Sequence, residues 1–171
     1  MGGLVTTTRT DGSTTGRQKV GIAEYAVVTD GTVLVTSGLG SCLGIVLYDP
    51  ETAIAGLLHA MLPSTSEGRG TDPAKFVDAG IEEMIQTMEG NGAHRDRLRA
   101  WIVGGSQMLE FTTNEASIGE RNVTVAKRLF ERYDVPIVGE DVGGNHGRSI
   151  KFDPSGPSLT IRTATKATKT L

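Results

Sequence analysis

Two apolar segments in the first third of the chain flank a short polar loop. Residues 43–48 and 53–60 are mostly Leu, Ile, Val, Ala and Gly, and residues 49–52 between them read Asp-Pro-Glu-Thr. A short loop with turn-forming residues between apolar segments predicts a β-hairpin. With Tyr48 opposite Ala53, paired residues have numbers that sum to 101, so Cys42 is expected directly opposite His59.

Further strands are expected before this hairpin. Residues 20–28 and 32–36 are rich in β-branched side chains, and the turn signal Asp30-Gly31 separates them. This arrangement predicts a second hairpin, so four strands precede the first helix.

Two segments have the signals of helices. Asp72 and Pro73 are typical of an N-cap and a first helical position, and Ser117 and Glu120 have the spacing of a capping box. The first segment continues with an apolar stripe at helical spacing, which comprises Val77, Ile81, Met84, Ile85 and Met88. The second continues with Val123, Ala126, Leu129, Phe130 and Tyr133.

The remaining apolar segments predict strands at residues 98–103, 136–142, 149–152 and 158–161. The expected element order is therefore ββββαβαβββ, with about eight strands and two helices. Runs of strands around only two helices favour an α+β layered domain, because a parallel doubly wound sheet requires strict alternation.

Composition sets the extent of this domain. The 171 residues suit one domain. Residues 1–17 and 163–171 are rich in Thr, Gly, Ser, Lys and Ala and carry few bulky apolar side chains. They cannot bury enough surface to offset their ordering entropy. We therefore expect a disordered N-terminal tail (1–17), a folded domain (18–162) and a frayed C-terminal tail (163–171).

Charge and targeting signals restrict the partners. The formal charge of −3 comes from interspersed acidic and basic residues, which argues against nucleic acid and favours protein or small-molecule partners. The single cysteine cannot form an intramolecular disulfide, and the N-terminus lacks a signal-peptide pattern. No apolar stretch approaches the roughly 20 residues of a membrane helix. A cytoplasmic protein without direct membrane insertion is expected.

Cys42 ends the turn-rich run 36–42, just before the first arm of the hairpin. In the expected register its Cβ lies about 4.5–5.5 Å from that of His59. An imidazole at this distance lowers the pKa of a thiol and holds it as the reactive thiolate. The pair is thus a candidate nucleophile and base. The alternative is that Cys42 is a small buried hydrophobic residue and His59 a structural strand histidine.

Several motifs in the same order resemble one known family, the CheD chemoreceptor glutamine deamidases. Residues 21–25 (GIAEY) resemble the family's opening strand, and residues 36–42 (TSGLGSC) resemble its segment TLGLGSC, with Ser37 as the one replacement. Residues 59–63 (HAMLP) agree with H-x-M-L-P. Gly104-Gly105, residues 118–123 and residues 141–148 follow in order, so the resemblance spans about residues 20–162.

The resemblance implies an enzyme, a protein-glutamine glutaminase that converts receptor glutamines to glutamates and releases ammonia. It implies Cys42 as nucleophile, His59 as general base and Thr36 as the residue that orients the imidazole. The implied fold is a sandwich of mixed or antiparallel sheets with two helices packed against them, similar to bacterial toxin-type cysteine deamidases. The implied partners are the cytoplasmic domains of chemotaxis receptors, as substrate, and a CheC-type phosphatase.

Amide hydrolysis by a thiol also needs donors for the oxyanion of the tetrahedral intermediate. Backbone amides around Gly40, Ser41 and Leu43 are expected to supply them, because glycine lets the main chain approach a substrate closely. Asn145 and Arg148 lie in a glycine-rich turn and are candidate substrate contacts, although the turn lacks the Lys-Ser/Thr of a phosphate-binding loop.

No cofactor or metal is expected. Cys42 and the three histidines include no close ligand pair, and His94 and His146 are expected in polar loops.

Two other functions stay open from the sequence. The same thiol chemistry suits a receptor methylesterase or another protein amidase. A non-catalytic adaptor that binds CheC or receptors is the alternative from a different class, and the presence of Thr36, Cys42 and His59 argues against it.

Overall fold

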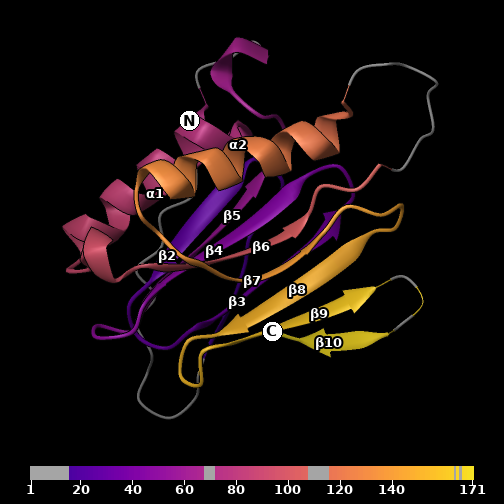
Figure 1. Cartoon of the computed structure of the whole chain (residues 1–171). Coiled ribbons are helices and arrows are strands. Elements are labelled where there is room, and N and C mark those ends of the chain that lie inside the picture. The colour runs from indigo at the N-terminus through magenta and orange to yellow at the C-terminus, as the bar shows by residue number, and fades with distance from the viewer. Residues whose placement is uncertain (1–15, 68–71, 108–115, 164, 166) are drawn as a thin grey trace.

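The fold is a three-layer sandwich of helices, an inner sheet and an outer sheet (Figure 1). The computed structural model describes residues 16–67, 72–107, 116–163, 165 and 167–171. The inner sheet comprises, in spatial order, β2 (Glu24–Val28), β5 (Ile54–Ala60), β4 (Leu43–Asp49), β6 (Arg99–Gly104) and β7 (Ile137–Val142). The outer sheet comprises β1 (Arg17–Lys19), β3 (Val33–Leu39), β8 (Arg148–Asp153), β9 (Ser158–Thr163) and β10 (Thr168–Thr170).

Each sheet contains one parallel pair, β6 with β7 and β1 with β3, and is otherwise antiparallel. Helices α1 (Val77–Gly90) and α2 (Ile118–Arg132) pack on the inner sheet. The short 3-10 helices are η1 (Thr65–Glu67), η2 (Pro73–Lys75) and η3 (Arg95–Arg97). The expected α+β sandwich of mixed sheets is confirmed.

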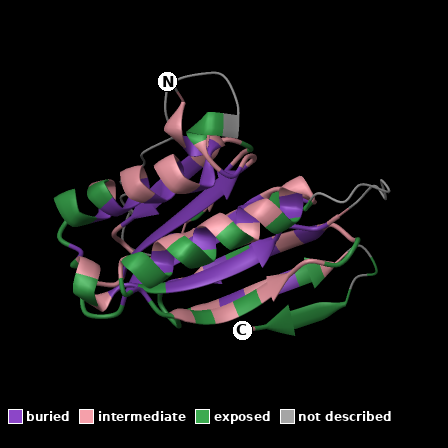
Figure 2. Cartoon of the chain, turned by 45° about the horizontal axis from the view of Figure 1, so that its top comes forward, coloured by how far each residue is buried: buried purple, intermediate pink, exposed green. Residues whose placement is uncertain are grey.

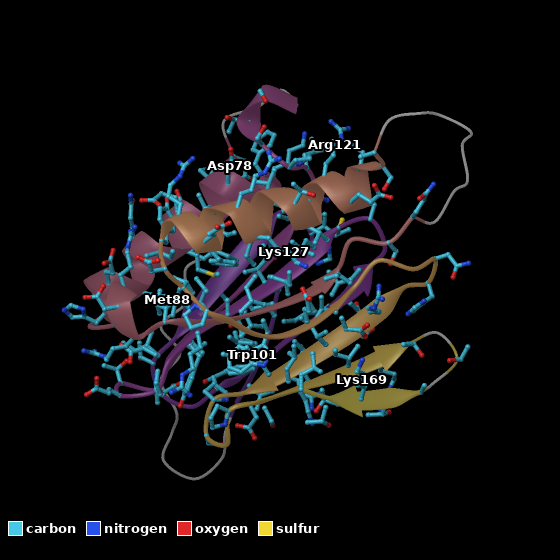
Figure 3. The ribbon with its side chains drawn as sticks, in the orientation of Figure 1. Asp78, Met88, Trp101, Arg121, Lys127 and Lys169 are labelled. Atoms are coloured by element: carbon cyan, nitrogen blue, oxygen red, sulfur yellow. The ribbon has the colours of Figure 1, made fainter. Side chains whose placement is uncertain are left out.

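The central strand of the inner sheet, β4, and its neighbour β5 are buried along their whole length (purple in Figure 2). Alternate residues of β4 face the helices (Leu43, Ile45) and the outer sheet (Val46, Tyr48). Both faces are covered, which agrees with strands that are apolar apart from Asp49 and His59. Trp101, labelled in Figure 3, joins the sheets by packing against Phe152 of β8, with ring centroids 5.0 Å apart.

The helices begin close to their expected positions. Ser117 caps α2 by accepting a hydrogen bond from the Glu120 amide, so the expected N-cap residue is confirmed. Asp72, however, caps η2 and not α1. Phe76 between them is extended and forms a parallel bridge with Leu62, so α1 begins at Val77, four residues after the expected first helical position at Pro73. All five residues of the expected stripe on α1 are buried.

The strand expected at residues 20–28 begins only at Glu24, as β2, and β1 precedes it. The hairpin expected between residues 20–28 and 32–36 is wrong, because β2 belongs to the inner sheet and β3 to the outer sheet. A turn that contains Ala23 at φ 60° separates β1 from β2, and the Gly21 amide donates to the Glu24 carboxylate across it at 2.7 Å. Five strands therefore precede α1. The sequence pattern missed β1 because its three residues, Arg17–Lys19, are polar, and it extended β2 too far because Val20 and Ile22 continue the apolar pattern.

The chain end also differs from expectation. Where a frayed tail was expected, β10 pairs with β9, and Leu171 exchanges two backbone hydrogen bonds with Leu159. Threonine favours extended structure, and backbone pairing at a sheet edge requires no apolar side chain. At the other end, Arg17 already belongs to β1. Residues 1–15 of the expected N-terminal tail lie outside the described residues.

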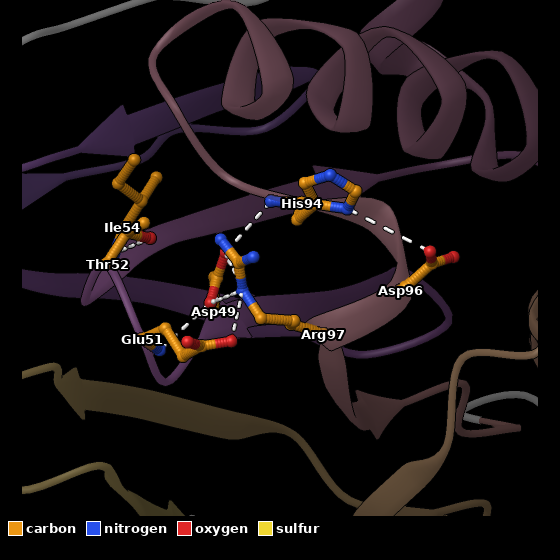
Figure 4. Close-up of polar contacts among 7 residues, drawn as sticks. All are labelled: Asp49, Glu51, Thr52, Ile54, His94, Asp96 and Arg97. Atoms are coloured by element: carbon orange, nitrogen blue, oxygen red, sulfur yellow. Dashed lines mark hydrogen bonds and ion pairs between the residues drawn. The ribbon is translucent and has the colours of Figure 1, made fainter.

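The β4–β5 hairpin closes one residue later than expected. Asp49 still belongs to β4 and pairs with Ile54, so paired numbers sum to 103. The Asp49 carboxylate is fully buried and accepts hydrogen bonds from the Arg97 side chain and the His94 and Glu51 amides (Figure 4). Burial acts to raise its pKa, but these hydrogen bonds hold the pKa at about 2. The loop is therefore residues 50–53.

The shifted register changes the pairing of the site residues. His59 lies opposite Gly44, and the residue opposite Cys42 would be Met61, so the expected direct pairing of Cys42 with His59 is wrong. The sum of paired residue numbers is 103 where 101 was expected. Because side chains alternate with a period of two, a difference of two leaves every residue on its expected face of the sheet. Cys42 and His59 therefore stay diagonal neighbours on the face that meets the outer sheet.

Candidate active site

Thr36 and His59 meet between the two sheets. The Thr36 hydroxyl on β3 lies 2.8 Å from Nδ1 of His59 on β5. Both residues are buried, with exposed fractions of 3% and 0%. The hydroxyl also donates to the carbonyl oxygen of Val20 at 2.7 Å.

This pair of hydrogen bonds determines the tautomer of the imidazole. A threonine hydroxyl has one proton, and that of Thr36 is donated to Val20. Nδ1 of His59 must therefore carry the ring proton and donate it to Thr36. Nε2 is then unprotonated, and it is buried without a hydrogen-bond partner. An imidazole with a free Nε2 lone pair is able to act as a base.

Cys42 lies immediately before β4, partly buried against the core between the sheets. Gly44, two residues later, is directly opposite His59 and has no side chain to place between the thiol and the imidazole. A Cβ at Gly44 would come within 3.0 Å of Leu39 and 3.1 Å of Ile150. The side chains of Leu39 and Ile150 therefore already fill the space in front of Gly44, and a larger residue there would press on both.

Burial controls the protonation of both groups. It lowers the pKa of His59 from 6.5 to about 4, so the imidazole is neutral near pH 7. Burial also raises the pKa of the Cys42 thiol, and the residue's own backbone amide lowers it less. The resting pair is a thiol and a neutral imidazole. The expectation that His59 holds a thiolate by lowering the thiol pKa is therefore wrong for this resting state.

Three consecutive carbonyl groups in the loop before β4 are held by hydrogen bonds. The donors are the Ser106 amide, the Asn122 side chain and the Gly105 amide, which bind the carbonyls of Gly40 (2.8 Å), Ser41 (2.8 Å) and Cys42 (2.9 Å) in that order. In a trans peptide the carbonyl and the following amide point in opposite directions. The amides of Ser41 and Cys42 therefore point away from these donors.

Only part of the expected group of oxyanion donors is available. The Gly40 amide donates to the carbonyl of Gly38 at 3.1 Å. Leu43 is the first residue of β4 and is paired on both sides, so its amide belongs to the sheet. In the described part of the chain, the Ser41 and Cys42 amides donate to no other residue. These two amides are the donors beside the thiol that bind no other described residue, and the Cys42 amide also lies against its own sulfur.

Asn122 is a residue that the sequence analysis quoted in a motif but assigned no role. Its Nδ2 donates to the carbonyls of Ser41 (2.8 Å) and Met61 (3.1 Å), and the side chain is fully buried. It thus links the Cys42 loop to the end of the His59 strand. The signal in the sequence was a polar residue on the apolar stripe of α2, between Gly119 and Ala126.

Glycines bring α2 close enough for this contact. Gly104 has φ 112°, and a Cβ there would lie 2.4 Å from the Cys42 carbonyl oxygen. A Cβ at Gly119 would lie 2.4 Å from the carbonyl oxygen of Ser106. No side chain fits at either position, so glycine is required on both β6 and α2.

The other two candidate contacts lie at the turn between β7 and β8, where Arg148 is held by partners within the protein. Arg148 is buried, and its Nη1 donates to Ser106 Oγ at 2.7 Å while Nη2 lies 3.4 Å from Asp141. Ser106 Oγ in turn lies 2.7 Å from the carbonyl oxygen of His146. Arg148 therefore stabilises the turn between β7 and β8. Asn145 is exposed in that turn.

Among the described residues, no group of three or more His, Cys, Asp or Glu side chains is placed to hold a metal ion. His94 is in a polar loop before η3, near Asp96. In the same part of the chain, no helix is long and apolar enough to cross a membrane.

A thiol, an imidazole with a free basic nitrogen, a buried hydroxyl and two free backbone amides are the groups that cysteine hydrolases use. The model of the family described as "CheD chemotactic sensory transduction" matches residues 61–163. The chain belongs to the CheD family.

Curated relatives agree with this assignment. A "Probable chemoreceptor glutamine deamidase CheD" of Haloarcula marismortui is 46% identical over 159 residues, which cover 93% of this chain and 92% of the relative. One of Geobacillus kaustophilus is 43% identical and covers 92% and 98%. The "Chemoreceptor glutamine deamidase CheD" of Halalkalibacterium halodurans is 41% identical and covers 88% and 96%. A solved structure, the Bacillus licheniformis protein YfiH, has a TM-score of 0.45 at 12% identity, covering 71% of this chain and 49% of that one.

Proposed function

We propose that this chain deamidates glutamine side chains of chemotaxis receptors, with Cys42 as nucleophile, His59 as general base and Thr36 as the residue that orients the imidazole. Membership of the CheD family and the names of the relatives support this substrate. The observation that carries the mechanism is the Thr36–His59 hydrogen bond, because it leaves Nε2 as the basic nitrogen.

The first half-reaction forms a thioester. The Cys42 thiol proton passes to Nε2 of His59 as Sγ attacks the carboxamide carbon of the substrate. The amides of Ser41 and Cys42 donate to the resulting oxyanion. The imidazolium then returns its proton to the leaving nitrogen, the C–N bond breaks, and ammonia departs.

The second half-reaction regenerates the thiol. His59 takes a proton from a water molecule as that water attacks the thioester carbon. The C–S bond breaks, and the imidazolium proton passes to the Cys42 sulfur. The net reaction is amide plus water to carboxylate and ammonium.

The protonation states suit proton transfer within the acylation step. A neutral imidazole is the form that accepts the thiol proton, and burial keeps His59 neutral well below pH 7. Because burial also favours the thiol, the thiolate forms only as the substrate carbonyl is attacked.

We place this activity in the cytoplasm, with the cytoplasmic domains of the receptors as protein substrates and a CheC-type phosphatase as a partner. The family resemblance supports both assignments. Co-elution of the two purified proteins in size-exclusion chromatography tests the CheC interaction, and separate elution over the concentrations tested would contradict it.

Intact-mass spectrometry of a receptor cytoplasmic fragment tests the reaction. Incubation with the wild-type protein is expected to give the small mass gain of an amide-to-acid conversion, and Cys42→Ala is expected to abolish it. A mass loss from a methylated fragment would support a methylesterase instead. No mass change on any receptor, with a folded protein, would favour the adaptor.

A further inference from the structure

A groove on the face of the outer sheet away from the inner sheet lies over β3, with a volume of about 330 Å³. Its floor is formed by short side chains, among them Val35 and Ser149. Four long cationic side chains border it, namely Arg17 and Lys19 from β1, Lys151 from β8 and Arg162 from β9.

The strand register places these cations on both sides of β3. Lys19 pairs with Val35, and Val35 pairs with Lys151, so the two ammonium groups flank the same floor residue. Arg162 lies beyond β8, opposite Ser149. Alternation along β8 and β9 turns the apolar neighbours of these cations toward the core.

The groove has an uncompensated positive charge. None of its ten lining residues is acidic, and within the described residues none of the four cations forms an ion pair. Elsewhere, Arg95, Arg97 and Lys127 each pair with a carboxylate. The chain as a whole has a formal charge of −3, so the positive charge is a local property of this groove.

We propose that this groove binds an acidic segment of a protein partner, with carboxylates of that segment between the β1 cations and those of β8 and β9. Charge complementarity favours this occupant. Single-stranded nucleic acid fits less well, because no aromatic side chain lines the groove for base stacking.

The groove is adjacent to the candidate active site. Thr36 lines it and bonds His59 from the same strand, and Ser37, also in the lining, lies in the irregular end of β3 that leads to the Cys42 loop. A bound segment would therefore lie beside the strand that carries Thr36. The binding itself does not depend on the proposed reaction.

Fluorescence anisotropy with a labelled polyglutamate peptide tests the groove. The double variant Lys19→Glu/Lys151→Glu is expected to weaken binding by about ten-fold or more. The matched control is Arg128→Glu/Arg132→Glu on α2, in the layer beyond the inner sheet, which makes the same change in net charge and is expected to keep the wild-type affinity. Added salt is expected to weaken wild-type binding.

Two results would overturn the proposal. Equal loss in both double variants would show that net charge alone attracts the peptide. Tighter binding of a single-stranded oligonucleotide of matched charge, lost in the groove variant, would assign the groove to nucleic acid. If the charge reversal impairs folding, the double variant Lys19→Gln/Lys151→Gln replaces it. It removes both charges at exposed positions, and weaker peptide binding is again expected.

Discussion

The hydroxyl of Thr36 and Nδ1 of His59 lie 2.8 Å apart in the buried space between the two sheets, although 23 residues separate them in the chain. Because the same hydroxyl donates to Val20, the imidazole proton is confined to Nδ1. The chemistry of the site therefore depends on a contact between β3 of one sheet and β5 of the other.

Removing the Thr36 hydroxyl is expected to lower kcat. Thr36→Val keeps the shape but leaves the Nδ1 proton of His59 without an acceptor, at a cost of about 1–3 kcal/mol. Losing the tautomer preference should reduce kcat by roughly ten- to hundred-fold. Thr36→Ser, which keeps a hydroxyl, should retain most of the rate. A Val variant with wild-type kcat would show that the hydroxyl does not orient the base.

The low pKa of His59 predicts a loss of stability in mild acid. The unfolded chain takes up a proton near pH 6.5, whereas the folded protein does so only near pH 4. Stability is therefore full above the unfolded pKa and falls as the pH drops from 6.5 to 4, by about 3 kcal/mol at most.

Urea unfolding at about pH 7 and about pH 4.5 measures this loss. His59→Gln cannot titrate, so its stability should change less between the two conditions than that of the wild type. Asp49 interferes little, because its stabilisation is lost mainly as the pH falls from its unfolded pKa of 3.8 to its folded pKa of about 2, below both conditions. Equal changes in both proteins would contradict the buried neutral imidazole.

A side chain at Gly104 is expected to displace the nucleophile loop. In Gly104→Ala the new Cβ would lie 2.4 Å from the Cys42 carbonyl oxygen, at a φ of 112° that alanine rarely adopts. We expect a loss of about 1–3 kcal/mol in stability and a marked fall in kcat. Gly156→Ala is the matched control, because no atom lies within 4 Å of its Cβ position. Wild-type kinetics in Gly104→Ala would show that the loop tolerates the shift.

The Asn122 link is tested with Asn122→Asp, which keeps the shape but replaces the two N–H donors. An ionised carboxylate would face the carbonyls of Ser41 and Met61, so kcat should fall near pH 7. Burial raises the pKa of such an aspartate, and its protonated form restores one donor. Activity should thus recover partly as the pH falls. Asn91→Asp, at an exposed helix end, should show no such recovery.

The Asp49 cluster provides a stability prediction that is separate from catalysis. Asp49→Ala leaves the Arg97 guanidinium and the His94 amide without their buried acceptor, at a cost of about 3 kcal/mol. Glu51→Gln at the exposed partner should cost less than about 1 kcal/mol. Thermal unfolding measures both. Asp49 ends β4, whereas Cys42 lies just before its first residue. The folded fraction should therefore keep its kcat.

Local pattern was sufficient for the α+β class and for the existence of most elements. The apolar stripe of α1, the Ser117 cap of α2 and the apolar arms of the hairpin are periodic or local signals, and all are present in the structure. The motifs around Cys42 and His59 were likewise enough to identify the family. These features depend on residues close together in the chain.

Tertiary structure decided the rest. The register of β4 and β5 depends on Asp49 continuing the strand to meet Arg97, 48 residues away. The upward shift of the Cys42 thiol pKa depends on burial. The roles of Asn122 and Gly104 depend on the close approach of α2 and β6 to the Cys42 loop. The sequence by itself determined which groups are present and which strands carry them. Only packing determined their hydrogen bonds and protonation, because both depend on neighbours that come from distant parts of the chain.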